Sequence, residues 1–207
     1  MDNQEVSTYF SAYQVPFPQP ANTKIKTIEF LNAARTLVGL LEKLGKVFAP
    51  ARYDMNGNIE KLTRKYNEDK MKNEYVEDML LVEKQEGKLF AIDALMWLRR
   101  GLHFMLEFFE NIVNDTACQE DLSSFIKEAY ALTLQKYHGW FGSNLFSMLS
   151  RLVPHRKVLL KYIALDKDNC EEYVLRDMKA FTVNLRICVN HLIEFYRDNE
   201  LESEAKV

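Results

Sequence analysis

The segment DMNGNIEK, residues 54–61, carries three polar side chains whose spacing can place them on one helix face. Asp54, Asn58 and Lys61 are separated by four and then three residues, which matches the 3.6 residues of a helical turn. A carboxylate, an amide and an ammonium group then present hydrogen-bond acceptors and donors together. The structural alternative is that Asp54 caps the helix while Asn58 and Lys61 are solvated.

A second group of polar residues lies on the most apolar segment of the chain, residues 88–113. Asp93, Trp97 and Arg100 recur there at intervals of four and three residues, so they share one face of the expected helix. A helix that is apolar almost all round is normally central and buried. Either these side chains belong to a site, or they are edge residues of a buried helix whose charges are paired or reach solvent.

The segment KYHGWFGSNLF, residues 136–146, combines a histidine with two aromatic residues at a helix junction. Gly139 is typical of the residue that follows a helix, which places His138 at a helix end. Trp140 and Phe141 follow at the junction. They either pack as an apolar plug or enter a membrane interface, where tryptophan is favoured.

The remaining reactive residues match no known catalytic or metal-binding pattern. The four histidines are scattered, and the three cysteines form no CxxC pair and have no histidine at metal-ligand spacing. The motifs HExxH, GxSxG and GxGxxG and the phosphate-binding Walker loop are absent from the sequence. The sequence therefore predicts no catalytic residue, no metal site and no cofactor.

Length and composition indicate a soluble protein of one large domain or two small ones. Of 207 residues, 47% are apolar, which is enough for a sizeable core, and the 7 glycines and 5 prolines are few enough for long regular elements. A net charge of −3 gives no general attraction to nucleic acid. Residues 1–22 lack a signal-peptide pattern, no uncharged apolar run reaches membrane-spanning length, and an odd number of cysteines suits a reducing compartment. We therefore expect a cytoplasmic protein with no nucleic-acid partner.

Apolar residues recur at helical spacing along most of the chain, so the expected fold class is all-α. The prolines within residues 1–22 predict an extended N-terminal segment. Thr27 is the expected N-cap of the first long helix, which should end near Gly45. Further helices are expected over residues 54–66, 68–86, 88–113, 120–138, 141–150, 154–165 and 169–198.

Taken together, four stretches resemble the glycolipid transfer protein family. They are DMNGNIEK, ALMWLRRGL at residues 94–102, KYHGW at residues 136–140 and the final AKV, in matching order and spacing. The similarity runs from about residue 25 to the C-terminus. It implies a two-layer helical sandwich of about eight helices, formed as a single domain by residues 23–207 after the segment 1–22. Members of the family carry one glycosphingolipid between membranes.

The resemblance implies a role for each residue of these polar groups. Asp54, Asn58 and Lys61 are expected to hydrogen-bond the first sugar, whose hydroxyls both donate and accept. Trp97 is expected to offer its indole face to that ring. His138, helped by Asp54, is expected to bind the ceramide amide, which has one N–H and one C=O, while the lipid chains enter an apolar interior.

The resemblance also implies a transient membrane surface as a partner. It places Tyr130 and Trp140 in contact with that surface, and Phe141 follows Trp140 in the same junction. We expect a monomer. A protein partner bound through residues 1–22 is kept open, since VPFPQP is a conceivable docking strip.

Two positions depart from the pattern of the family. Ala205 stands where glycolipid carriers often have a tyrosine before the terminal Lys-Val, which puts one ligand contact or terminal latch in doubt. Asn144 stands where the animal proteins usually have a lysine, which weakens the electrostatic part of membrane docking.

Other functions stay open beside the glycolipid carrier. The branch of the family that carries ceramide-1-phosphate has a basic residue at the position of Trp97, so this tryptophan favours a sugar. Lys61, Arg99 and Arg100 nevertheless keep an anionic headgroup such as sulfatide possible. A lipid sensor acting through a protein partner is a further alternative, whereas nothing positive supports an enzyme.

Overall fold

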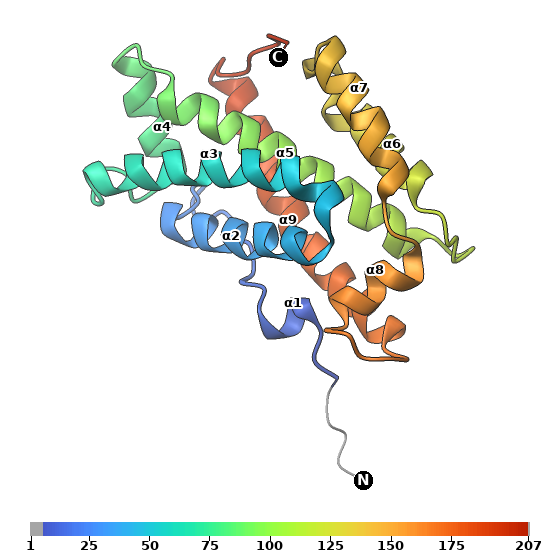
Figure 1. Ribbon diagram of the computed structural model, residues 1–207. Helices are drawn as coiled ribbons and strands as arrows, with labels where there is room; N and C mark the ends of the chain where they lie inside the picture. Colours follow the sequence, from blue (N-terminus) through green and yellow to red (C-terminus); the bar gives the residue numbers. More distant parts are fainter. Residues whose placement is uncertain (1–5, 207) are drawn as a thin grey trace.

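The computed structural model describes residues 6–206, apart from the side chains of Val47 and Phe141. Within that part the regular structure is helical, which confirms the all-α prediction (Figure 1). Nine α-helices follow one another there: α1 Tyr9–Ala12, α2 Thr27–Lys43, α3 Ala49–Glu68, α4 Val76–Gln85, α5 Phe90–Asn114, α6 Ser123–Thr133, α7 Trp140–Leu149, α8 Arg156–Ile163 and α9 Glu171–Asp198. Short 3₁₀ turns at Lys46–Phe48, Gln135–Tyr137 and Ser150–Leu152 join some of them.

Helix α5 lies at the centre of the fold. It contacts α3, α4, α6 and α9, and Figure 1 shows α3 in front of it and α9 behind it. Its residues are apolar on nearly all sides, so the helix can be stable only where other helices cover it. Its N-terminus is also buried, and the buried Glu83 carboxylate accepts hydrogen bonds there from the N–H groups of Ala91 and Ile92 at 2.6 and 2.8 Å.

Helix α3 begins five residues earlier than expected. It starts at Ala49, with Pro50 in the first turn, where the missing N–H of proline costs no hydrogen bond. Asp54 is therefore an interior residue of the helix and cannot be its N-cap. Helix capping therefore does not explain why an aspartate stands at position 54.

The helix expected over 68–86 begins only at Val76. Asp69 ends the preceding helix, and its carboxylate accepts hydrogen bonds from the N–H groups of Met71 and Lys72, which holds the chain in a turn. The prediction for Thr27 was also wrong, because Thr27 is the first helical residue and its hydroxyl donates to the carbonyl of Asn73 at 2.8 Å. This bond ties the start of α2 to the turn before α4.

The N-terminal segment is more ordered than its prolines suggest. Thr8 and Ser11 form a capping box around α1, so the expectation of an extended chain is wrong for residues 9–12. Phe10 and Phe17 are buried, and the Phe10 ring stacks on Phe181 of α9 at a centroid distance of 4.8 Å. This additional helix explains why the described chain has more helices than expected.

The remaining helices agree with the predictions to within a few residues, except that the one expected over 120–138 is interrupted. Helix α6 ends at Thr133, and the turn Gln135–Tyr137 follows. His138 then has an extended backbone, and Gly139 is the N-cap residue of α7 rather than the residue that ends α6. No helix among residues 6–206 is long and apolar enough to cross a bilayer.

Candidate functional site

The polar triad lies on one face of α3, with Asp54 and Lys61 exposed and Asn58 buried between them. Asn58 is 4% exposed, and its side-chain N–H donates to the Asp54 carboxylate at 3.2 Å, one helical turn away. Lys61 is exposed. All three residues line a surface hollow of about 490 Å³. The predicted face of acid, amide and ammonium is therefore present, with the acid and the ammonium open to a ligand and the amide at the floor of the hollow.

The carboxylate of Asp54 has an unusual electrostatic setting for a surface helix. Burial raises the pKa of this carboxyl above its ordinary value, although the Lys61 ammonium and the hydrogen bond from Asn58 act in the opposite direction. Asp54 also lines a second, more internal cavity. It therefore stands where the surface hollow and the interior meet.

That internal cavity has a volume of about 340 Å³ and lies between α3, α5, α6 and α7. Its polar lining consists of Asp54, Trp97 and His138, which the structure brings together from three distant segments. The other lining residues are glycine or apolar: Pro50, Ala51, Met55, Gly101, Phe104, Leu134, Gly142, Leu145, Phe146 and Leu149. A small polar group beside an apolar cavity is typical of a ligand site.

Trp97 is half-buried on α5 and lies nearly parallel to His138. The two ring centroids are 6.4 Å apart and the rings make an angle of 21°. The Arg100 guanidinium is 4.6 Å from the Trp97 ring and 3.4 Å from the Tyr137 ring. These neighbours hold the indole in a defined orientation at the edge of the cavity.

His138 is positioned by the break between α6 and α7. Its Nδ1 lies 3.1 Å from the Tyr130 hydroxyl. Burial, together with the positive charge of Arg100, lowers the pKa of His138 below its ordinary value. The ring is therefore neutral near pH 7 and offers one donor and one acceptor nitrogen.

The three residues expected at a membrane differ in position. Trp140, the first residue of α7, is 82% exposed. Tyr130 is only 5% exposed and its ring stacks on Phe146 at 3.7 Å, so its side chain cannot contact a membrane in this conformation. It supports His138 instead. The side chain of Phe141 lies outside the described residues.

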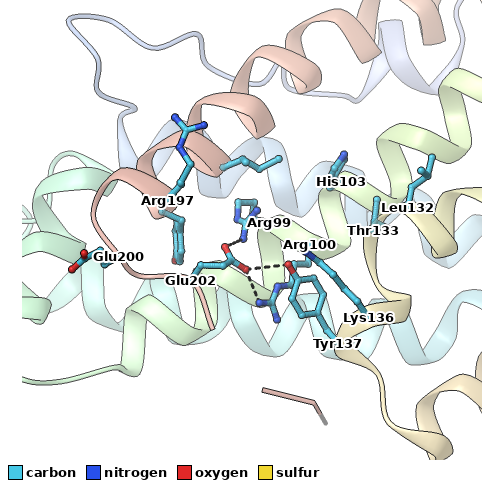
Figure 2. Close-up of a pocket in the computed structure, with 12 residues that line it drawn as sticks. Arg99, Arg100, His103, Leu132, Thr133, Lys136, Tyr137, Arg197, Glu200 and Glu202 are labelled. Carbon is cyan, nitrogen blue, oxygen red and sulfur yellow. Dashed lines mark hydrogen bonds and ion pairs between the residues drawn. The ribbon is translucent and has the colours of Figure 1, made fainter. Parts of the chain in front are cut away.

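Sequence reasoning missed two features near this site. Met148 and Leu152 are exposed apolar residues that follow Trp140 along α7 and the next turn. The second feature is an ion-pair cluster in which Glu202 of the C-terminal tail reaches between Arg99 and Arg100 (Figure 2). No helical period could reveal that contact, because the tail is about one hundred residues away in sequence.

Comparisons with known proteins identify the family of the chain. Residues 25–165 match the family model described as Glycolipid transfer protein (GLTP). Glycolipid transfer protein A of Xenopus laevis is 30% identical over 198 residues, which cover 91% of this chain and 95% of that protein. Pleckstrin homology domain-containing family A member 8 of Mus musculus is 33% identical over 220 residues, which cover all of this chain and 42% of that protein.

A solved structure shows the same fold. The GLTP-fold structure of FAPP2, described as selecting simple glycosphingolipids, has a TM-score of 0.87 and 28% sequence identity. The match covers 97% of this chain and all of that one. It confirms the helical sandwich that the sequence resemblance implies.

Proposed function

Because the chain belongs to the glycolipid transfer protein family, we propose that it binds one glycosphingolipid and carries it between membranes. The observation that supports this most is the meeting of Asp54, Trp97 and His138 at one apolar cavity beside the open polar face of α3. A glycosphingolipid has the same order of groups: a sugar, an amide and two hydrocarbon chains.

The sugar occupies the hollow on α3 in this proposal. Its hydroxyls donate to the Asp54 carboxylate and accept from the exposed Lys61 ammonium. Asn58 is already held by Asp54 and adds a fixed amide to the floor of the hollow. Trp97 stacks against the C–H face of the ring.

In this proposal the ceramide amide lies at the polar side of the internal cavity. Asp54 and His138 line the cavity at its polar side, and the neutral imidazole supplies one donor and one acceptor. The amide N–H donates to the Asp54 carboxylate and the amide C=O accepts from His138. The hydrogen bond between Tyr130 and His138 Nδ1 keeps the ring in place, which leaves Nε2 for the ligand.

The hydrocarbon chains provide the reason for a carrier. Each CH₂ buried contributes about 0.8 kcal/mol, so a sixteen-carbon chain resists transfer into water by roughly 12 kcal/mol. A cavity of about 340 Å³ lies at the low end of the range for ligand sites, about 300–1,000 Å³. Two chains therefore require α7 to move outward from α5 when the lipid enters.

Helix α7 is suited to that movement because it also carries the exposed apolar surface. We place Trp140, Met148 and Leu152 at the membrane, with the exposed Arg151 beside them to attract anionic headgroups. Docking of this surface brings the bilayer next to the helix that lines the cavity.

The neutral sugar is favoured over an anionic group attached directly to ceramide. Arg100 pairs with Glu202 of the C-terminal tail and is not among the residues that line the internal cavity, so it does not meet a headgroup there. The Asp54 carboxylate, in contrast, repels a phosphate at the ceramide amide. Ceramide-1-phosphate is therefore the weaker candidate, and sulfatide, whose sulfate lies on the far side of the sugar, is the stronger anionic one.

Several finer expectations stay predictions. The proposal involves no covalent step, and it treats residues 23–207 as one domain on which residues 6–22 pack. The monomeric state, the cytoplasmic location and a protein partner at residues 1–22 also stay predictions.

A transfer assay between vesicles tests the proposal. Labelled glucosylceramide, galactosylceramide, lactosylceramide and ceramide-1-phosphate are compared, and the acceptor lipid is recovered to show that it is intact. We expect transfer of the glycolipids, and loss of most of it in Trp97→Ala while the variant stays folded. Hydrolysed lipid, or transfer of ceramide-1-phosphate alone, would contradict the proposal.

A further inference from the structure

A separate pocket is lined by Arg99, Arg100 and Lys136, and Trp97, which lines the internal cavity, is not among its lining residues. The pocket has a volume of about 480 Å³ and is formed by α5, α6, the turn Gln135–Tyr137, α9 and the C-terminal tail. Figure 2 shows the Glu202 carboxylate between Arg99 and Arg100, with Tyr137 beside it. Neither the proposed sugar site nor the membrane surface uses this pocket.

The two arginines are buried far more than guanidinium groups usually are. The side chains of Arg99 and Arg100 are 5% and 2% exposed, and a buried charge is tolerated only when it is paired and hydrogen-bonded. Glu202 pairs with both: Arg100 donates to one carboxylate oxygen at 2.6 Å, and Arg99 donates to the other. One carboxylate therefore serves two guanidinium groups.

This pairing leaves buried hydrogen-bond donors unused. Nε of Arg99 and both Nε and Nη1 of Arg100 have no hydrogen-bond partner among the described residues. The rings of Tyr196 and Tyr137 cover the guanidinium faces but accept no conventional hydrogen bond from these edges. A planar carboxylate with two oxygens cannot satisfy so many donors, whereas a tetrahedral group with three or more oxygens can.

The excess of positive charge along this pocket also favours an anion with more oxygens than a carboxylate. Lys136 also lines the pocket, and its ammonium lies 4.7 Å from the Tyr137 ring. Arg197 and Glu200 line it as well, but in Figure 2 both point away from Glu202. Two buried guanidinium groups thus share a single carboxylate, which lies on a tail without helical structure, and the Lys136 ammonium adds positive charge to the pocket wall.

We propose that this pocket binds a phosphate-type anion and that the Glu202 carboxylate occupies the site when no such anion is present. The anion takes the place of the carboxylate between Arg99 and Arg100, and the tail is released. The proposal does not rest on the transport of glycolipid. It predicts a link to the first site, because Arg100 touches both the anion and the ring of Trp97.

Trp97 provides the readout for the test. The chain has two tryptophans, so Trp140→Phe leaves Trp97 as the only indole. In that background we expect a saturable change of Trp97 fluorescence on titration with inorganic phosphate, and none with chloride at the same ionic strength. Glu202→Gln removes the internal competitor and should lower the half-saturating phosphate concentration about tenfold.

Glu204→Gln is the matched control, because it removes the same charge from the same tail at an exposed position. It should leave the phosphate titration unchanged. Arg100→Lys keeps the charge but loses the fork of donors, and should raise the half-saturating concentration about tenfold. If Arg100→Lys does not fold, the comparison of Glu202→Gln with Glu204→Gln decides alone.

A second arm identifies the source of the phosphate. Flotation with phosphatidylcholine vesicles, with and without phosphatidic acid, is compared for Glu202→Gln and Glu204→Gln in the chain that retains Trp140. Stronger binding of Glu202→Gln to the phosphatidic acid vesicles assigns the pocket to a lipid headgroup, and a response to free phosphate alone assigns it to a dissolved anion. Equal behaviour of the two variants in both arms, or equal responses to phosphate and chloride, would overturn the proposal.

Discussion

Asp54→Val should separate neutral from sulfated glycolipids. The Asp54 carboxylate is the strongest acceptor of the triad, and it lines both the surface hollow and the internal cavity. The valine removes a partner of a sugar hydroxyl and of the ceramide N–H at once. It also removes the one negative charge of the triad, which opposes an anionic headgroup.

The magnitude follows from the contacts of the carboxylate. A hydrogen bond to a charged group contributes about 1.5–3 kcal/mol, so transfer of galactosylceramide should fall about tenfold or more. Asp54 also accepts from the buried amide of Asn58. Leaving that donor without a partner should lower the free energy of unfolding by about 1–3 kcal/mol.

Asp54→Asn distinguishes these two effects. Its amide oxygen can still accept from Asn58, so the stability cost should be smaller, while the charge is lost as in the valine variant. Sulfated galactosylceramide should suffer less than galactosylceramide in both variants, because Lys61 still attracts the sulfate and the repulsion is gone.

The assay is a side-by-side transfer series of galactosylceramide and its sulfated form with wild type, Asp54→Val and Asp54→Asn. Thermal unfolding of each variant is measured in parallel. Equal losses for both lipids would refute headgroup selection by Asp54 and leave it as a residue that stabilises α3.

Three other perturbations test neighbouring parts of the site. Trp140→Ala should reduce binding to vesicles about tenfold or more, because burying a large apolar side chain contributes about 1.5–3 kcal/mol. Lipid that is already bound should stay bound. Met71 is also highly exposed, so Met71→Ala is the control in the flotation assay. Gly142→Ala should weaken lipid binding several-fold without unfolding the chain, because a Cβ there would lie 3.1 Å from Cβ and Cγ of His138; unchanged affinity would show that His138 has room to move or no role. Lipid affinity measured against pH should be constant above pH 6.5 and fall on acidification. The pKa of His138 is lowered, so this ring gains its proton only below pH 6.5. The pKa of the Asp54 carboxyl is raised, so it gains its proton at less acid pH than an ordinary aspartate. An affinity that rises on acidification would contradict the binding roles of His138 and Asp54.

The triad was predictable because it is local. Asp54, Asn58 and Lys61 lie on a single helix, so the helical period alone places them on one face. Their identity as a site required more, because the period cannot show that α3 begins at Ala49 and that Asp54 is no cap. Family resemblance supplied the roles of Trp97 and His138, and the structure supplied their common cavity.

Several of the errors have a common physical cause, which is contact between residues far apart in sequence. Tyr130 was expected at the membrane, but its burial depends on Phe146 of α7. The Arg99–Arg100–Glu202 cluster needs the tail to fold back on α5. The late start of α4 depends in part on the hydrogen bond from Thr27 to the carbonyl of Asn73, 46 residues away. None of these contacts leaves a periodic pattern in the sequence.

The most direct test of the account is native mass spectrometry of the chain after incubation with vesicles that contain galactosylceramide. We expect the chain separated from the vesicles to carry one intact galactosylceramide, and Trp97→Ala recovered in the same way to be largely free of lipid. A chain that recovers no glycolipid, or a Trp97→Ala variant that is loaded as fully as wild type, would contradict it.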